Sequence, residues 1–361
     1  MQFPRTQWLR LLVVGVAATG SGCAGWKNQP HPRTGALPFP GVSTLYVTAD
    51  PARLGSHVSG LCACRRTKKD RPHRFDEAGR GIIYTRQAGF LDLAHVRNTI
   101  DWTYYVYRRV RPALADQRPA LKIHGADRSV WFVQVVDAPR WQHAAAEGGE
   151  ALVDETALRL AQHIAYDMMT WHEIITAFGY ASSGFIPETR SAFTCEDITS
   201  HALGIEIAGQ AIRAGGCFDQ AVTRLLDHRM DELEAVSPEL TDAAVEKVRD
   251  RWWEPERALR YQYDVGQVTA CVRPWLVAGM SDVGADFGRP LPLVSLDDVL
   301  GWNLTGWFRV ELEPHVMEGA PIRRVLGGDV DRITPSEHFA RIIVYIRKQT
   351  LTRLGPDCDR P

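Results

Sequence analysis

The sequence predicts an α+β fold, a helix-dominated single domain with a small and mainly antiparallel sheet. Three short segments rich in β-branched and aromatic residues are typical of strands, and four longer segments with helical apolar spacing and capping residues are typical of helices. A hydrophobic content of 45% and 11 tryptophans are sufficient for a sizeable core.

The expected strands are residues 80–85, 129–137 and 304–313, and the last of these alternates polar and apolar side chains. They are separated by helical segments and not arranged as a repeat. We therefore expect a small, mainly antiparallel sheet in a domain dominated by helices.

The expected helices are residues 92–112, 154–179, 194–216 and 334–351. Asp92 is the expected N-cap of the first helix, which should end before Pro112. The second should begin at Asp154, and it is apolar on more than one side, as is typical of a central helix. The last opens with Thr334, Pro335 and Glu337, a capping box with proline at the first helical position.

The N-terminus carries the pattern of a signal peptide over residues 1–22. Arg5 and Arg10 precede an apolar run that is too short to span a bilayer, and small residues follow it. The ending Ser21-Gly22-Cys23 resembles the lipobox of bacterial lipoproteins, in which the cysteine is diacylated and becomes the first residue. The usual leucine of that motif is replaced here by Gly20, so an ordinary secretory signal is the alternative.

The region after the signal peptide is expected to be a tether and then a single domain. Residues 23–42 contain four prolines and are typical of an extended tether, which leaves residues 43–361 as one globular α+β domain. In lipoproteins, Ala24 after the cysteine is associated with the outer membrane. The expected location is therefore the periplasmic face of the outer membrane, with the lipid on Cys23 as the membrane contact.

The charge gives no reason to expect nucleic acid as a partner. The net charge of the whole chain is −1, and removal of residues 1–22 takes away two arginines and no acid, which leaves −3. The basic segment 64–74 has two interpretations, a solvated loop or a contact with anionic lipid headgroups, lipopolysaccharide or another cell-wall component.

Six cysteines remain if Cys23 is lipidated, and an even number in an oxidising compartment permits up to three disulfides. We expect partial disulfide bonding, with Cys195–Cys217 as the first candidate. Cys62-Ala-Cys64 lacks the second half of a four-ligand zinc pattern.

His172 and Glu173 stand side by side within the apolar segment 166–180. Burial of an acid and an imidazole is costly unless they pair, hydrogen-bond or hold a metal. Neighbouring residues are about 100° apart on a helix, so this pair cannot chelate one ion by itself. The motif H-E-x-x-H also fails, because Thr176 stands where the second histidine is required. A metal at His172 therefore needs ligands from other helices.

Two other segments can supply such ligands. Asp92 and His95 are three residues apart in the first turn of their helix, and the start of the third helix carries Glu196, Asp197, Ser200 and His201. The structural alternative is that Asp92 is only an N-cap, that Thr194 and Asp197 form a capping pair, and that each histidine is hydrogen-bonded in the core. The three polar clusters together favour a shared site.

Three blocks of the sequence, residues 81–102, 165–180 and 193–209, resemble the signature blocks of a bacterial family of lipoproteins catalogued as domain of unknown function 4056. The third block departs from the family pattern, which has Ser-Pro-Glu-Asp and an asparagine after the serine. This chain has Thr194-Cys195-Glu196-Asp197, and His201 after Ser200. The resemblance implies a location and a class of protein, not a reaction, and it does not carry His201 over as a family site.

We therefore expect an outer-membrane lipoprotein with a His/acid site. If it is an enzyme, we expect a metal-dependent hydrolase of an envelope component. His95, His172 and Glu196 would hold a divalent ion such as zinc, and Glu173 or Asp197 would be the general base. The alternative is a non-catalytic structural or binding lipoprotein, in which the same residues form a buried network that fixes the helix packing.

Overall fold

The computed structural model of the protein describes residues 48–57, 81–125, 127–180, 192–249, 251–254, 259–260, 271–280, 288–328 and 330–354. These residues all belong to the second of two units, residues 32–361, into which the chain divides. The expected signal peptide, the tether and the basic segment 64–74 lie outside the described residues. Among the described residues, no helix has the length and apolar character needed to cross a membrane.

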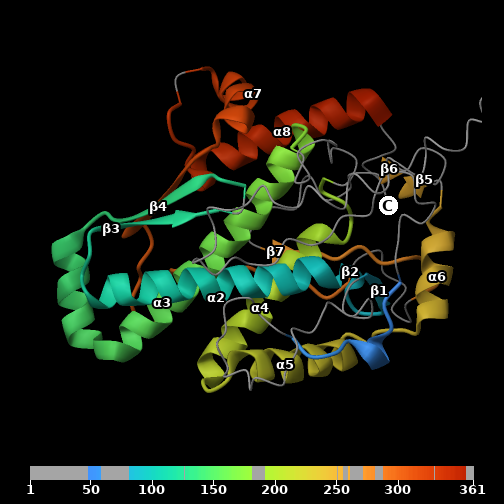
Figure 1. The fold of residues 1–361 in the computed structure, drawn as a ribbon, viewed down its shortest axis with the longest axis horizontal. Coiled ribbons are helices and arrows are strands. Elements are labelled where there is room, and N and C mark those ends of the chain that lie inside the picture. The colour runs from blue at the N-terminus through green and yellow to red at the C-terminus, as the bar shows by residue number, and fades with distance from the viewer. Residues whose placement is uncertain are drawn as a thin grey trace, which may run out of the picture. The chain divides into compact units, whose positions relative to one another are not determined.

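Helices dominate the described part of the chain. Helix α3 (Ala138–Ala177) packs against α2 (Leu93–Ala115) and α4 (Asp197–Ala214), and Figure 1 shows these three helices crossing at the centre, with α5 below α4. The remaining helical elements are η1 (Pro51–Arg53), α5 (Phe218–Glu232), α6 (Pro238–Lys247), α7 (Val316–Leu326) and α8 (Pro335–Leu354).

The strands form small antiparallel sheets. One sheet has the order β3-β4-β9, and the hairpin β1-β2 leads directly into α2. The strand bounds are β1 (Ile82–Thr85), β2 (Gly89–Asp92), β3 (Ala120–His124), β4 (Val130–Val135), β5 (Trp253–Glu254), β6 (Leu259–Arg260), β7 (Cys271–Val272), β8 (Leu291–Pro292) and β9 (Phe308–Glu313). The expected helix-dominated α+β fold with a small antiparallel sheet is confirmed. The three expected strands correspond to β1, β4 and β9.

Two helix boundaries differ from the sequence prediction. Helix α3 begins at Ala138 and not at Asp154, because Asp137 accepts a hydrogen bond from Arg140 N and caps an earlier segment, which joins the later one across a kink at Gly149 (φ 61°). Helix α2 continues past Pro112 to Ala115. Proline in the last turn removes only one helical hydrogen bond, and Leu114 still has to be buried in the core.

Hydrogen bonds cap the two helix starts that were recognised in the sequence. The Asp92 carboxylate accepts hydrogen bonds from Ala94 N (2.7 Å) and His95 N (3.2 Å), as expected for an N-cap. At the start of α8, the Thr334 N–H donates to His338 Nδ1 (2.9 Å). A capping box would send this bond to Glu337, so the imidazole takes the role expected of that carboxylate.

A glycine sets how closely α4 approaches α2. A Cβ on Gly204 would lie 2.6 Å from Thr99 Cβ and 2.8 Å from Val96 O, distances that real Cβ atoms do not reach. The two helix backbones therefore approach each other more closely than any larger residue would allow. Because Gly204 lies three residues after His201 and Thr99 four residues after His95, this approach also brings the polar starts of both helices together.

Candidate metal site

The ends of three helices meet at one place in the core. His95 lies in the first turn of α2, Glu173 lies in the last turns of α3, and His201 lies in the second turn of α4. The Asp92 N–H donates to Ser200 Oγ (2.8 Å), and this bond ties the start of α2 to α4. Local capping and helix packing therefore place three side chains from distant parts of the sequence at one point.

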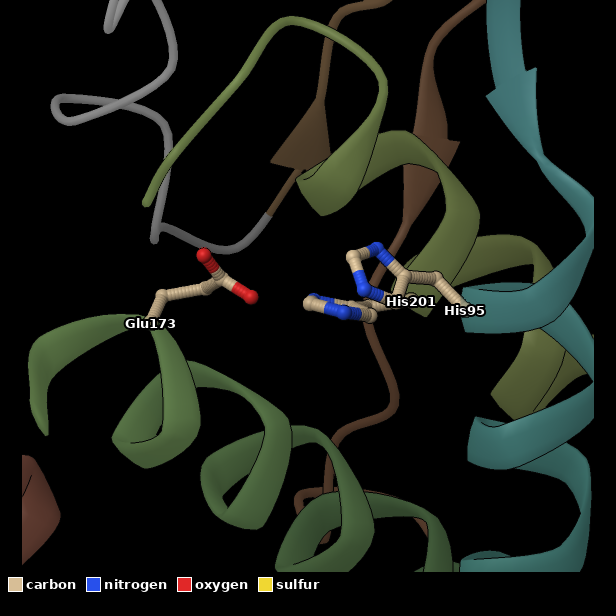
Figure 2. A group of neighbouring side chains, drawn as sticks. All are labelled: His95, Glu173 and His201. Carbon is tan, nitrogen blue, oxygen red and sulfur yellow. The ribbon is translucent and has the colours of Figure 1, made fainter. Parts of the chain in front are cut away.

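His95, Glu173 and His201 form a group in which one potential ligand atom from each residue lies within 4.8 Å of the others. Figure 2 shows the Glu173 carboxylate pointing toward the two imidazole rings, whose centroids are 5.3 Å apart. Glu173 and His201 are each 1% exposed, whereas the His95 side chain is 27% exposed. The group is thus buried, with its solvent-accessible side at His95.

Asp197 contacts the His95 ring at Nδ1. His95 Nδ1 lies 2.8 Å from Asp197 Oδ1, but the oxygen is out of line with the ring N–H, so the contact is an ion pair and not an aligned hydrogen bond. The second carboxylate oxygen accepts from Thr194 N (2.7 Å) and Thr194 Oγ1 (2.8 Å), which is the expected capping pair. Asp197 is therefore held on both oxygens, and His95 Nε2 is left as the ring atom that can bind a metal.

The Glu173 carboxylate has one fixed partner in the backbone. Its Oε2 accepts a hydrogen bond from Phe193 N (2.8 Å). Burial and the nearby Asp197 carboxylate raise the pKa of Glu173 well above its usual range, although His95 and the Phe193 N–H act in the opposite direction. Without a cation in the group, the protonated form of Glu173 is therefore favoured more than in a free glutamate.

The charges of His95 and Asp197 stabilise each other. Burial opposes protonation of His95, but Asp92 and Asp197, followed by Glu173, outweigh it and raise the pKa of His95 well above its usual range. Burial acts against the Asp197 anion, but His95, together with His201 and Thr194, lowers the pKa of Asp197. The metal-free pair is therefore an imidazolium and a carboxylate.

The two other histidines near this group, His172 and His201, are neutral. Burial and the positive charge on His95 lower the pKa of His201 well below its usual range, and its buried Nδ1 has no hydrogen-bond partner among the described residues. Burial and His95 also lower the pKa of His172, to about 4. Neutral imidazoles are the form that binds divalent metals.

The structure brings together some of the residues expected from the sequence and separates others. His95 and Glu173 belong to the group, and Asp197 lies beside it as the partner of His95. His172 is close enough to influence the charge of His95 and His201, but its ring lies against Tyr180, with centroids 6.0 Å apart, and it is not in the group.

Glu196 is fully buried next to this site but is also outside the group. Its carboxylate accepts a hydrogen bond from the Cys195 thiol (3.2 Å). The set that the described residues bring within ligand distance is thus His95, Glu173 and His201, and not the expected set of His95, His172 and Glu196.

The sequence analysis did not assign His201 as a ligand, because the family pattern has asparagine at this position. A signal was present, since His201 lies four residues after Asp197 and therefore on the same face of α4. The choice between His172 and Glu173 depends on the rotation of α3 about its axis, which packing decides.

The expected Cys195–Cys217 disulfide is wrong. Cys195 carries a thiol that donates to Glu196, whereas Cys217 is disulfide-bonded to a partner outside the described residues. Cys195 lies in the buried turn before α4, and Cys217 follows the Gly215-Gly216 stop at the far end of that helix. Because α4 is 18 residues long, its two ends are about 27 Å apart, too far for one disulfide.

Two imidazoles and one carboxylate are a donor set for a divalent metal. A set of two histidines and a glutamate is the ligand set of several catalytic zinc sites, which keep a fourth position for water or substrate. In such a site, the carboxylate that holds a ligating imidazole fixes its orientation and tautomer, as Asp197 holds His95. The arrangement can bind an ion, and the ion can activate a water molecule.

Comparisons with known proteins give a family and no function. A family model described as "Protein of unknown function (DUF4056)" matches residues 20–267. The matched range contains α2, α3 and α4 and therefore all the residues of the candidate site. No curated protein and no solved structure matches this chain.

Proposed function

The chain belongs to the DUF4056 family of proteins of unknown function, and within that family we propose that it is a metal-dependent hydrolase of an envelope component, anchored to the outer membrane by a lipid on Cys23. The observation that carries the proposal is the group of His95, Glu173 and His201, whose ligand atoms lie within 4.8 Å of one another.

The ligand types and their spacing support a divalent ion. Ligand atoms around a tetrahedral zinc ion lie roughly 3.4 Å apart, so small side-chain rotations close the observed group around an ion. His95, Glu173 and His201 would hold the ion through three ligands, and the ion would supply Lewis-acid activation of water for hydrolysis.

The other residues would support this ion and not bind it. Asp197 would orient His95 and strengthen it as a ligand, so we assign Asp197 a positioning role in place of general base. Glu173 would act as the anionic ligand. His172 remains a neutral imidazole beside the group, where it can contact a substrate.

Metal content is the direct test of the site. The purified protein, treated with chelator and then incubated with zinc, should retain about one ion per chain by mass spectrometry. His201→Ala and Glu173→Gln should lose this ion. His163→Ala is the matched control, because His163 is an exposed histidine on α3 that pairs with Asp167 (3.6 Å) and is not in the group, and it should retain the ion.

Hydrolysis is tested with the same proteins on isolated cell envelope. The zinc-loaded protein should release soluble fragments, and His201→Ala should not. If the protein binds no divalent metal and His201→Ala only lowers stability, the residues are a structural network and the proposal fails. Oxygen-dependent turnover with iron would also contradict it, because the same donor set can hold Fe(II) for redox chemistry.

The proposed location has a separate test. Cys23→Ser should move the protein from the outer-membrane fraction to the soluble periplasmic fraction, because the acyl chains provide the membrane affinity. A variant that still sediments with the outer membrane would show that the anchor is wrong, without any consequence for the metal site.

A further inference from the structure

A second concave site lies between β9, α7 and α8, and it shares no residue with the metal site. It is a cavity of about 730 Å³, within the usual size range of ligand pockets. We call it the β9 pocket, and its lining residues are Glu311, Glu313, Arg323, Val330, Asp331, Arg332 and His338. In Figure 1, α7 and α8 lie together at the top, above the sheet.

Strand alternation explains why this pocket is charged. Leu312 and Ile333 exchange two backbone hydrogen bonds, each 2.8 Å long, and both side chains are fully buried. The side chains of the residues next to them in the chain therefore point to the opposite face. This places Glu311 and Glu313 opposite Arg332 on one rim of the pocket.

Two residues that line the pocket, Arg332 and Glu311, already form an ion pair with each other. Arg332 donates to Glu311 (3.3 Å), and its guanidinium lies over the Phe132 ring, 3.8 Å from the centroid. This stacked arginine is fixed by two contacts. Arg332 therefore lines the pocket, but we do not assign it a role in ligand binding.

The remaining charged groups are not paired with one another. Arg323 has a buried Nε without a hydrogen-bond partner among the described residues, and the ion pairs of the described residues include neither Arg323, Glu313 nor Asp331. His338 accepts the Thr334 N–H at Nδ1, so the ring hydrogen lies on Nε2, which is left to donate. The pocket thus offers donors on one side and two carboxylates on the other.

We propose that the β9 pocket binds a small zwitterion of the size of an amino acid or dipeptide. Its carboxylate would be held by Arg323 and His338, and its ammonium group by Glu313 and Asp331. A guanidinium that has no carboxylate partner among the described residues gains most from a ligand carboxylate, because charge-assisted hydrogen bonds are the strongest that it can form. A purely anionic ligand would be repelled by the two carboxylates, and a purely cationic one would leave Arg323 without a partner.

Isothermal titration calorimetry with L-alanyl-L-alanine tests the proposal on the whole protein. The dipeptide should bind, and N-acetyl-L-alanyl-L-alanine and L-alanyl-L-alanine amide, which each lack one charge, should bind at least tenfold more weakly. Arg323→Gln should weaken dipeptide binding at least tenfold. Arg324→Gln is the matched control, because this neighbouring exposed arginine does not line the pocket, and it should leave the affinity unchanged.

Three results would overturn the proposal. They are no saturable binding of the dipeptide, equal binding of the capped and uncapped forms, and equal loss in Arg323→Gln and Arg324→Gln. Circular dichroism and zinc content should be unchanged in both variants, so a loss of binding can be separated from a loss of folding or of the metal site.

Discussion

His95 Nδ1 lies 2.8 Å from Asp197 Oδ1, and this contact joins the first turn of α2 to the first turn of α4. Both residues were candidates from sequence for different tasks, ligand and base. Their contact gives them one task, since the carboxylate that holds an imidazole on one nitrogen presents the other nitrogen to an ion.

Asp197→Asn should weaken zinc binding by about 10- to 100-fold without unfolding the protein. Asparagine is similar in shape and can still accept from Thr194, but it removes the negative charge beside His95. Zinc affinity measured by competition with a chelating dye would show the change. Asp219→Asn, which removes an acid from the first turn of α5, controls for the loss of a helix-dipole interaction and should have no effect on zinc.

Zinc affinity should increase as the pH rises from 6 to 8. Because the pKa of His95 is raised well above 6.5 in the metal-free protein, His95 holds a proton that the ion must displace, and the raised pKa of Glu173 acts in the same direction. Binding should therefore release protons, measured by calorimetry in buffers of different ionisation enthalpy. An affinity that does not depend on pH would contradict the ligand assignment.

The metal-free protein should lose stability in mild acid through His172. The pKa of this group falls from 6.5 to about 4 on folding, so its contribution is fully present above about pH 6.5 and is lost as the pH falls toward 4. With chelator present, the free energy of unfolding should fall by on the order of 1 kcal/mol between pH 7 and 5 from this group. His172→Asn should show a smaller fall in urea denaturation, and an identical fall would sink the prediction.

Gly204→Ala should destabilise the protein by about 1–3 kcal/mol and also weaken zinc binding. The added Cβ would collide with Thr99 and Val96 O and push α4 away from α2, which separates His201 from His95. Thermal and urea unfolding measure the first effect. Gly319→Ala in α7 is the control: its nearest contact, Pro314 Cβ at 3.3 Å, needs a shift of only a few tenths of an ångström, so it should destabilise the protein less than Gly204→Ala and leave zinc binding unchanged.

Thiol labelling of the denatured, unreduced protein should modify Cys195 and leave Cys217 unmodified. Peptide mass spectrometry identifies the labelled residues and the partner of Cys217. Cys195→Ser should preserve folding, because a hydroxyl can also donate to Glu196. Labelling of Cys217 before reduction would contradict the structure.

Several elements could be recognised from sequence because their signals are local. The β-branched segments became β1, β4 and β9, and Asp92 caps α2 through hydrogen bonds within three residues. The first half of α3, residues 138–148, was missed, because only Trp141 and Ala144 of it are buried and its apolar periodicity is therefore weak. Helices α5, α6 and α7 were also not predicted.

The sequence by itself determined the helix-dominated class and the presence of polar residues on three helices that apolar residues would otherwise occupy. Only the tertiary structure decided which of these residues meet. His172 and Glu173 point about 100° apart on one helix, so only one of them can face the starts of α2 and α4. The rotation of α3, set by the burial of its apolar side chains, and the close approach at Gly204 direct Glu173 toward His95 and His201.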